Sequence, residues 1–224
     1  MLCTLIFIIQ KIAFKDDMMV ALYFGFNYQA VVGANQYYRI VTAALSHQSI
    51  AHILFNMCAM AVFSVAMEKN YGTFFFFAVN LWLLFFCSAI QLLYAQARIF
   101  WLPESLGGAS LDVLVTYAYG YSAILFGLVM LLSLTGDRYI NFYGCKVCKI
   151  FIPFAYLLAS QMVAPNADLF GHLSGILAAV ILRYCFIYQL RLLPQQSWIQ
   201  GVEKTYGESS KSLHEKMGYF YASD

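Results

Sequence analysis

The sequence predicts an all-α, polytopic membrane protein built as a bundle of six transmembrane helices. The 224-residue chain is 62% hydrophobic and only 11% charged, whereas an average soluble domain is about 45–50% apolar and about 25% charged. The length accommodates about six spans of about 20 residues together with their loops. A soluble fold of this size could not bury so much apolar surface, so lipid is the expected solvent of the helices.

Six apolar stretches mark the expected helices. The first is short for a span and contains Lys11. We expect it to be a helix that begins abruptly rather than a signal peptide, because no small-residue cleavage site follows it. Residues 1–188 are expected to form the membrane domain and residues 189–224 a polar tail. The predicted spans are Leu2–Phe14, Ser49–Met67, Gly72–Tyr94, Thr116–Leu134, Ile150–Val163 and Leu169–Tyr188.

The basic residues predict the orientation of the bundle, because cytosolic loops are enriched in Lys and Arg. With six spans, the short loops 68–71 and 135–149 share a side with the tail, and the long loops 15–48 and 95–115 lie opposite. We therefore expect a cytosolic tail and two long loops facing the lumen or the outside. The first side carries Lys69, Arg138, Lys146, Lys149, Arg183, Arg191, Lys204, Lys211 and Lys216, and the second Lys15, Arg39 and Arg98.

The cysteines and the net charge indicate neither a cofactor nor a nucleic-acid partner. Cys145 and Cys148 form a C-x-x-C pair, but a metal or redox site normally needs further ligands or a thioredoxin-like context, and the sequence offers neither. The formal net charge is only +2. We expect no cofactor and no metal. The other cysteines lie in apolar runs, where cysteine usually acts as a small hydrophobe: Cys3, Cys58, Cys87 and Cys185.

Four polar residues inside predicted spans are candidates for a functional site, because polar groups in lipid are costly. His52 and Asn56 lie four residues apart on one face of the second span, Ser122 lies in the fourth and His172 in the sixth. These three helices run inward from the outer face. At about 1.5 Å per residue, the four side chains are expected roughly 5–10 Å below the same surface.

Together these side chains contain the groups needed for acyl transfer. A serine hydroxyl becomes an effective nucleophile when a base takes its proton, and a histidine has a suitable pKa for that base. His52, Asn56 and the Ser122 backbone N–H are candidate donors to a developing oxyanion. No Asp or Glu lies at this depth, and Asp168 lies one turn away on the wrong side of His172. We therefore expect a Ser–His dyad rather than a triad.

Small residues predict close contact between the fourth and sixth helices. Gly171, Gly175 and Ala179 recur every four residues along the sixth, a pattern that lets a neighbouring helix approach closely. Gly120 and Gly127 are matching positions without a side chain on the fourth helix. Such contact is what a hydrogen bond between the serine and the histidine requires.

Each candidate also has a purely structural interpretation when it is taken singly. A serine in a membrane helix often bonds to its own i−4 carbonyl. An intramembrane histidine or asparagine can simply bridge two helices. The common depth of the four residues favours the functional interpretation.

The ordered set of motifs resembles the rhomboid family of intramembrane serine proteases over about residues 20–188. Residues 36–42 are similar to the family's aromatic-Arg segment, and residues 67–73 to the Glu and Gly that follow its second helix. Three motifs match by position and carry most of the resemblance: His52-x-x-x-Asn56, Gly120-Tyr121-Ser122-Ala123 and Gly171-His172-Leu173-Ser174-Gly175.

The resemblance implies a water-filled cavity open to the outer face, where a substrate helix enters laterally, unwinds and is cut near its end. Ser122 would be the nucleophile and His172 the general base, with His52 and Asn56 stabilising the oxyanion. Gly120 would let the backbone approach the substrate. The partners would be transmembrane protein substrates and the bilayer itself. The sequence carries no retention or lipid signal, so we expect either an organelle of the secretory pathway or the plasma membrane as the compartment.

Three departures from the family pattern carry expectations of their own. Phe126 stands where many members have a Tyr stacked on the catalytic histidine; it can still stack but lacks the hydroxyl. Tyr37 and Tyr38 stand where Trp is commoner. We expect the short first helix to affect the stability of the protein rather than its catalysis.

Two other functions remain as alternatives. An inactive rhomboid-like protein would bind membrane clients for quality control, but such relatives typically lose the Ser or the His, and this chain keeps both. A small transporter or channel would need polar residues through the full membrane depth, whereas residues 59–65 and 176–182 are almost entirely apolar or small. The motifs identify neither the substrate nor the oligomeric state.

Overall fold

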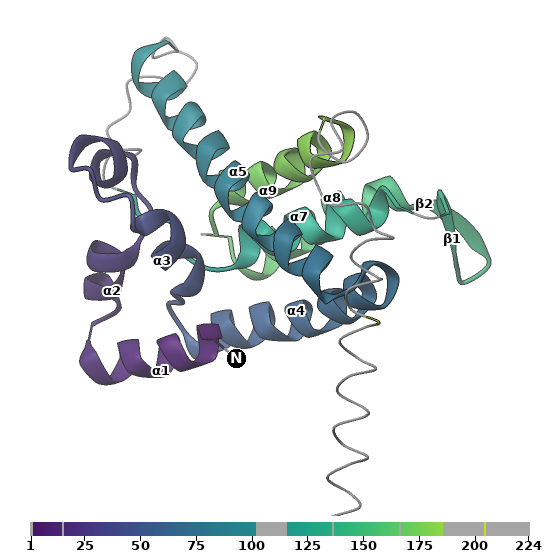
Figure 1. Ribbon diagram of the computed structural model, residues 1–224, viewed down its shortest axis with the longest axis horizontal. Coiled ribbons are helices and arrows are strands. Elements are labelled where there is room, and N and C mark those ends of the chain that lie inside the picture. The colour runs from purple at the N-terminus through teal and green to yellow at the C-terminus, as the bar shows by residue number, and fades with distance from the viewer. Residues whose placement is uncertain are drawn as a thin grey trace, which may run out of the picture.

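The computed structural model describes residues 2–14, 16–101, 116–135, 137–165, 167–185 and Lys204. The predicted tail thus lies outside the described residues except for Lys204. Helices dominate the described part, and one short hairpin accompanies them (Figure 1). The elements are α1 (Leu2–Ala13), α2 (Asp17–Phe24), the π-helix η1 (Gln29–Gly33), α3 (Arg39–Leu45), α4 (Ile50–Tyr71), α5 (Thr73–Phe100), α7 (Ser122–Ser133), β1 (Tyr139–Phe142), β2 (Cys145–Cys148), the 3-10 helix η3 (Lys149–Phe151), α8 (Ile152–Val163) and α9 (Leu169–Ile181).

The predicted spans correspond to α1, α4, α5, α7, α8 and α9. Two helical stretches, Ile50–Lys69 and Thr73–Phe100, are long and apolar enough to cross a membrane, and four further apolar helices are shorter. Helix α5 continues to Phe100, so the second long loop begins later than predicted, and its residues 102–115 lie outside the described part. A mostly helical arrangement with two long apolar helices is therefore supported, with different boundaries.

The predicted start of the fourth helix is wrong. We expected it at Thr116, but α7 begins at Ser122. The preceding residues pair with the first long loop instead, because Phe26 and Ala118 exchange two backbone hydrogen bonds of 2.7 and 2.9 Å. Gly120 then adopts a φ of +119°, a conformation open to glycine but not to a helix. Ser122 is consequently the first residue of its helix.

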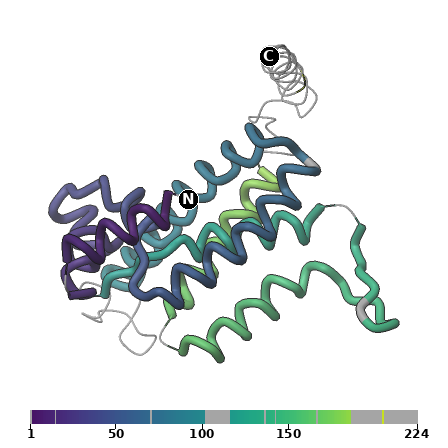
Figure 2. The backbone as a smooth tube through the Cα atoms, turned by 90° about the horizontal axis from the view of Figure 1, so that it is seen from below, coloured from purple at the N-terminus to yellow at the C-terminus, as the bar shows by residue number. Residues whose placement is uncertain are grey.

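Helix α7 forms the centre of the bundle. Every residue from Ile124 to Leu131 is buried, and a helix that is apolar on all sides needs partners on all sides. Helices α4, α5, α8 and α9 supply them, with the most extensive contact to α9. Figure 2 shows α8 at the margin of the bundle, and the hairpin projecting at the end opposite to α2 and α3.

The outer faces of the peripheral helices are apolar. Large hydrophobic side chains on α4 and α8 are more than half exposed to the surroundings of the chain. Soluble monomers rarely expose contiguous apolar patches of this extent, so these faces fit a lipid environment. They include Ile50, Leu54, Phe55 and Val62 on α4, and Leu158, Met162 and Val163 on α8.

The hairpin in loop 135–149 is an element that the all-α prediction missed. Strands β1 and β2 pair antiparallel from Tyr139↔Cys148 to Phe142↔Cys145. Tyr143 and Gly144 both have positive φ, of 47° and 82°, as a two-residue hairpin turn of type I′ requires. Cys145 and Cys148 lie three residues apart on β2, so their side chains point to opposite faces. Three strand residues span about 10 Å, too far for a disulfide.

Arg39 fixes the first long loop. Its side chain is only 4% exposed and donates to the carbonyl oxygens of Leu22 and Gly25, at 2.5 and 2.7 Å, and to the Gln36 amide oxygen at 2.6 Å. The two carbonyls lie at the C-terminal end of α2, where helical acceptors lack partners and a cation is favourable. One guanidinium thereby joins α2, α3 and the segment between them.

We predict that Arg39→Met lowers the free energy of unfolding by about 2–3 kcal/mol, because buried acceptors lose a charged donor. Equilibrium unfolding in mixed detergent micelles measures this change. The control is Arg138→Met, which removes an exposed guanidinium and should change the value by less than about 0.5 kcal/mol. Equal effects of the two substitutions would contradict the anchoring role of Arg39.

Candidate active site

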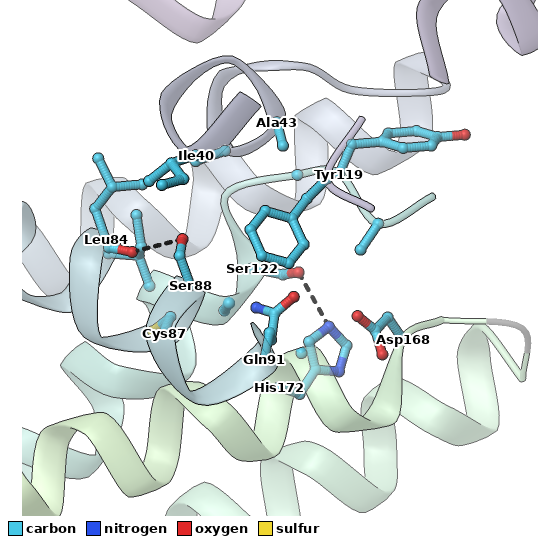
Figure 3. Close-up of a pocket in the computed structure, with 17 residues that line it drawn as sticks. Ile40, Ala43, Leu84, Cys87, Ser88, Gln91, Tyr119, Ser122, Asp168 and His172 are labelled. Carbon is cyan, nitrogen blue, oxygen red and sulfur yellow. Dashed lines mark hydrogen bonds between the residues drawn. The ribbon is translucent and has the colours of Figure 1, made fainter. Parts of the chain in front are cut away.

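Ser122 and His172 meet at the N-terminal ends of the central helices α7 and α9. The Ser122 hydroxyl oxygen lies 3.0 Å from Nε2 of His172 (Figure 3). Ser122 is the first residue of α7 and His172 the fourth of α9. The distance is within the hydrogen-bonding reach expected of a nucleophile and its base. The structure thus brings together the two residues that the sequence singled out as a dyad.

Glycines allow the backbones of α7 and α9 to touch. A Cβ atom added at Gly175 would overlap the carbonyl oxygen of Ala123 and lie 3.2 Å from the backbone nitrogen of Gly127. A Cβ at Gly127 would in turn lie 3.1 Å from the Gly175 carbonyl oxygen. Close contact of these helices was predicted, and Gly127 and Gly175 provide it.

The other two predicted glycines have different surroundings. A Cβ on Gly171 would meet the carboxylate of Asp168 at 2.5 Å, rather than a residue of α7. Gly120 precedes α7, so the prediction that it provides a close contact on that helix is wrong. A Cβ there would lie 2.7 Å from Nε2 of His52. Gly120 is therefore needed both for its positive φ and for the approach of the His52 ring.

Phe126 packs against the imidazole of His172. The two rings are 4.4 Å apart with an interplanar angle of 30°, and Phe126 also contacts Tyr156 at 5.0 Å. Phe126 is buried, so it restricts the histidine ring without offering a hydroxyl. The predicted ring contact is present, with the two rings tilted rather than parallel.

Nδ1 of His172 is buried and has no hydrogen-bond partner within the described part of the chain. Asp168 lines the same cavity (Figure 3), and burial raises the pKa of its carboxyl group. It forms no hydrogen bond with Nδ1. Among the described residues Ser122 and His172 form a pair with no third member, and its role as a catalytic dyad stays a prediction.

His52 and Asn56 lie on α4 beside the segment that leads to Ser122. The position of a Gly120 Cβ would be 3.9 Å from the amide nitrogen of Asn56. That nitrogen donates to the His52 carbonyl oxygen at 3.0 Å. Neither side chain belongs to the set that lines the cavity with Ser122 and His172. Both are close to the expected site, and their role as oxyanion donors stays a prediction.

A small open cavity lies beside the dyad. Its lining includes Ile40 and Ala43 from the first loop and Ser88 and Gln91 from α5 (Figure 3). The amide of Gln91 donates to the Ser174 hydroxyl at 3.2 Å. The sequence analysis did not predict these lining residues. Ser88 and Gln91 are polar residues in an apolar span, and this pattern could have indicated that they face a functional site.

His47 is a second residue that sequence reasoning did not assign to the site. It is 1% exposed, and its ring packs edge-on against His52 at 5.1 Å. Nε2 accepts the backbone N–H of Tyr121 at 3.4 Å, while Nδ1 lies 3.3 Å from the Leu45 carbonyl oxygen. Burial, followed by the proximity of His52, lowers the pKa of His47 to about 4. The ring is therefore neutral at neutral pH and keeps its acceptor.

We predict that Gly175→Ala lowers the free energy of unfolding by about 1–3 kcal/mol, because a methyl group forces two helix backbones apart. Thermal unfolding in detergent, followed by circular dichroism, provides the measurement. Gly33→Ala is the matched control, since its new methyl would meet only the flexible side chain of Gln29. If both variants lose the same stability, the backbone contact does not have the importance assigned to it.

Comparison with known proteins adds independent evidence. The Rhomboid domain model matches residues 34–189. Rhomboid-like protein 15 of Arabidopsis thaliana is 30% identical over 190 residues, which cover 81% of this chain and 44% of that protein. From the same plant, Rhomboid-like protein 14, mitochondrial, is 27% identical over 143 residues (64% of this chain, 41% of the relative). RHOMBOID-like protein 6, mitochondrial, is 24% identical over 202 residues (86% and 57%).

The chain spans about half the length of the curated relatives it matches. The family match nevertheless covers most of the chain, including Ser122, His172 and the predicted oxyanion donors His52 and Asn56. The apolar helical bundle and the geometry at Ser122 agree with that match. The chain belongs to the rhomboid family of membrane proteins.

Proposed function

We propose that this chain is an intramembrane serine endopeptidase that cleaves transmembrane segments of other membrane proteins. The observation that carries the proposal is the 3.0 Å pair of Ser122 and His172 at the edge of an open cavity. Either residue alone could be structural. A hydroxyl and an imidazole brought together from two helices, beside an open cavity, are suited to nucleophilic catalysis.

In the proposed reaction, Nε2 of His172 takes the hydroxyl proton as the Ser122 oxygen attacks the scissile carbonyl carbon. The carbonyl oxygen becomes negatively charged, and the candidate donors to it are His52, Asn56 and the Ser122 backbone N–H. The imidazolium then gives its proton to the leaving amine, and the peptide C–N bond breaks. A water molecule, activated by the same imidazole, hydrolyses the acyl ester and restores Ser122.

The substrate class follows from where the site lies. The dyad is at the N-terminal ends of α7 and α9, inside a bundle whose outer faces are apolar. A transmembrane helix would reach the cavity sideways through lipid. It would have to unwind there, because a helical peptide bond is covered by its own helix and side chains. The partners are therefore membrane-protein substrates and the bilayer.

The orientation proposed from the basic residues puts the dyad near the outer or lumenal face and the tail in the cytosol. The hairpin, with exposed Arg138 and Lys146, lies at the opposite end of the bundle from α2 and α3. That separation supports the proposed orientation. The plasma membrane or a secretory-pathway organelle is the proposed compartment, whereas two of the relatives are named as mitochondrial.

We predict that Ser122→Ala and His172→Ala each reduce cleavage by about 1,000-fold or more, because the members of a catalytic pair act as a unit. The assay uses purified protein reconstituted with a single-pass reporter whose helix contains small, helix-destabilising residues. Fragments are quantified by gel electrophoresis, and the cut is located by mass spectrometry.

Ser133→Ala is the matched control for this assay. It removes the same group from the other end of α7, where the hydroxyl bonds to the Val129 carbonyl oxygen at 2.8 Å, and cleavage should persist. A wild-type protein that binds the reporter and leaves it intact would reject the protease proposal. That result would favour the alternative, an inactive family member that holds membrane clients.

A further inference from the structure

Tyr121, the residue before the candidate nucleophile, has a side-chain contact that the dyad does not explain. Its hydroxyl donates to the amide oxygen of Asn80 on α5 at 2.5 Å. The amide nitrogen of Asn80 donates in turn to the Phe76 carbonyl oxygen at 2.6 Å. The second bond fixes the orientation of the amide, so that its oxygen faces the tyrosine. The pair is an ordered polar link between two helices.

The backbone of the same residue is held from another direction. The Tyr121 N–H points to Nε2 of His47 at 3.4 Å, and the N–H of Gly120 donates to the Ala43 carbonyl oxygen at 2.9 Å. The Tyr121 carbonyl oxygen accepts from Leu125 at 3.2 Å, within the first turn of α7. Tyr121 is therefore the point where an extended segment becomes a helix, held by the first loop on one side and α5 on the other.

This link has a consequence for the geometry of the dyad. Ser122 has no complete helical turn before it, so the position of its hydroxyl depends on how Tyr121 is held. The partner histidine is carried by a different helix, α9, where its ring packs against Phe126 of the next turn of α7. A small shift of Tyr121 would change the distance between Ser122 and His172, and misplacement by about 1 Å can cost about 100-fold in rate.

We propose that Asn80 is a positioning residue, which acts through the Tyr121 hydroxyl to keep Ser122 in line with His172. The catalytic part of this inference rests on the proposed protease function; the structural part does not. Asn80 is not one of the residues that line the cavity, and the bond between Ser122 and His172 does not include it. Its effect is exerted from α5, through one hydrogen bond, on the residue that precedes the nucleophile.

The test compares Tyr121→Phe, Asn80→Leu and the double variant with the wild-type protein. We expect kcat for reporter cleavage to fall about ten- to hundredfold in each single variant, with KM nearly unchanged, since the cavity walls are intact. The double variant should be no worse than the singles, because both act through the same bond. Tyr71→Phe is the matched control: it removes a tyrosyl hydroxyl at the far end of α4 and should leave kcat unchanged.

A readout independent of cleavage separates positioning from the protease proposal. The ¹⁵N shift of His172 Nε2, from histidine-labelled protein, reports its hydrogen bond to Ser122. We expect the shift to move toward that of a free imidazole in Tyr121→Phe and Asn80→Leu, and to stay in place in Tyr71→Phe. An unchanged shift in folded Tyr121→Phe and Asn80→Leu would overturn the positioning role, as would additive losses of kcat. If the wild type does not cleave, the proposed function fails, and the shift alone decides the role of Asn80.

Discussion

The backbone contact between α7 and α9 is the constraint on which the rest of the site depends. Gly175 leaves no room for a side chain against the Ala123 carbonyl, and Gly127 faces it from the other helix. Only at this separation can a hydroxyl at the start of one helix reach an imidazole in the first turns of the other. Because α7 is apolar on all sides, the surrounding helices then pack around this pair, and within the described part of the chain a cavity lies at its N-terminal end.

The second requirement is a fixed entry into α7, and the first loop supplies it. In a bundle surrounded by lipid, extended backbone needs partners within the protein. Phe26 and Ala43 provide them for the segment that ends at Gly120, while Arg39 holds the loop that carries both residues. The loop thus supports the candidate site as well as connecting two spans. Helix α5 adds a further support through Asn80 and Tyr121.

Much of this arrangement was readable in the sequence, for identifiable reasons. Long apolar runs predicted the helices, polar residues within those runs indicated Ser122 and His172, and the spacing of small residues predicted the glycine contact. The start of α7 was misplaced because residues 116–120 are apolar enough for a helix, yet their partners lie about 90 residues away at Phe26 and Asn27. The hairpin was missed because two four-residue strands in a basic loop give little signal. His47 and Asn80 gain meaning only from tertiary partners that one sequence does not name.

The central claim is that His172 activates Ser122 as a nucleophile. The most direct measurement is the mass of the intact protein after treatment with a fluorophosphonate, followed by peptide mapping of the modified residue. We expect one stoichiometric adduct on Ser122, formed much more slowly in His172→Ala and at an unchanged rate in Ser133→Ala. A wild-type protein that forms no adduct on Ser122, or one that labels equally fast without His172, would contradict it.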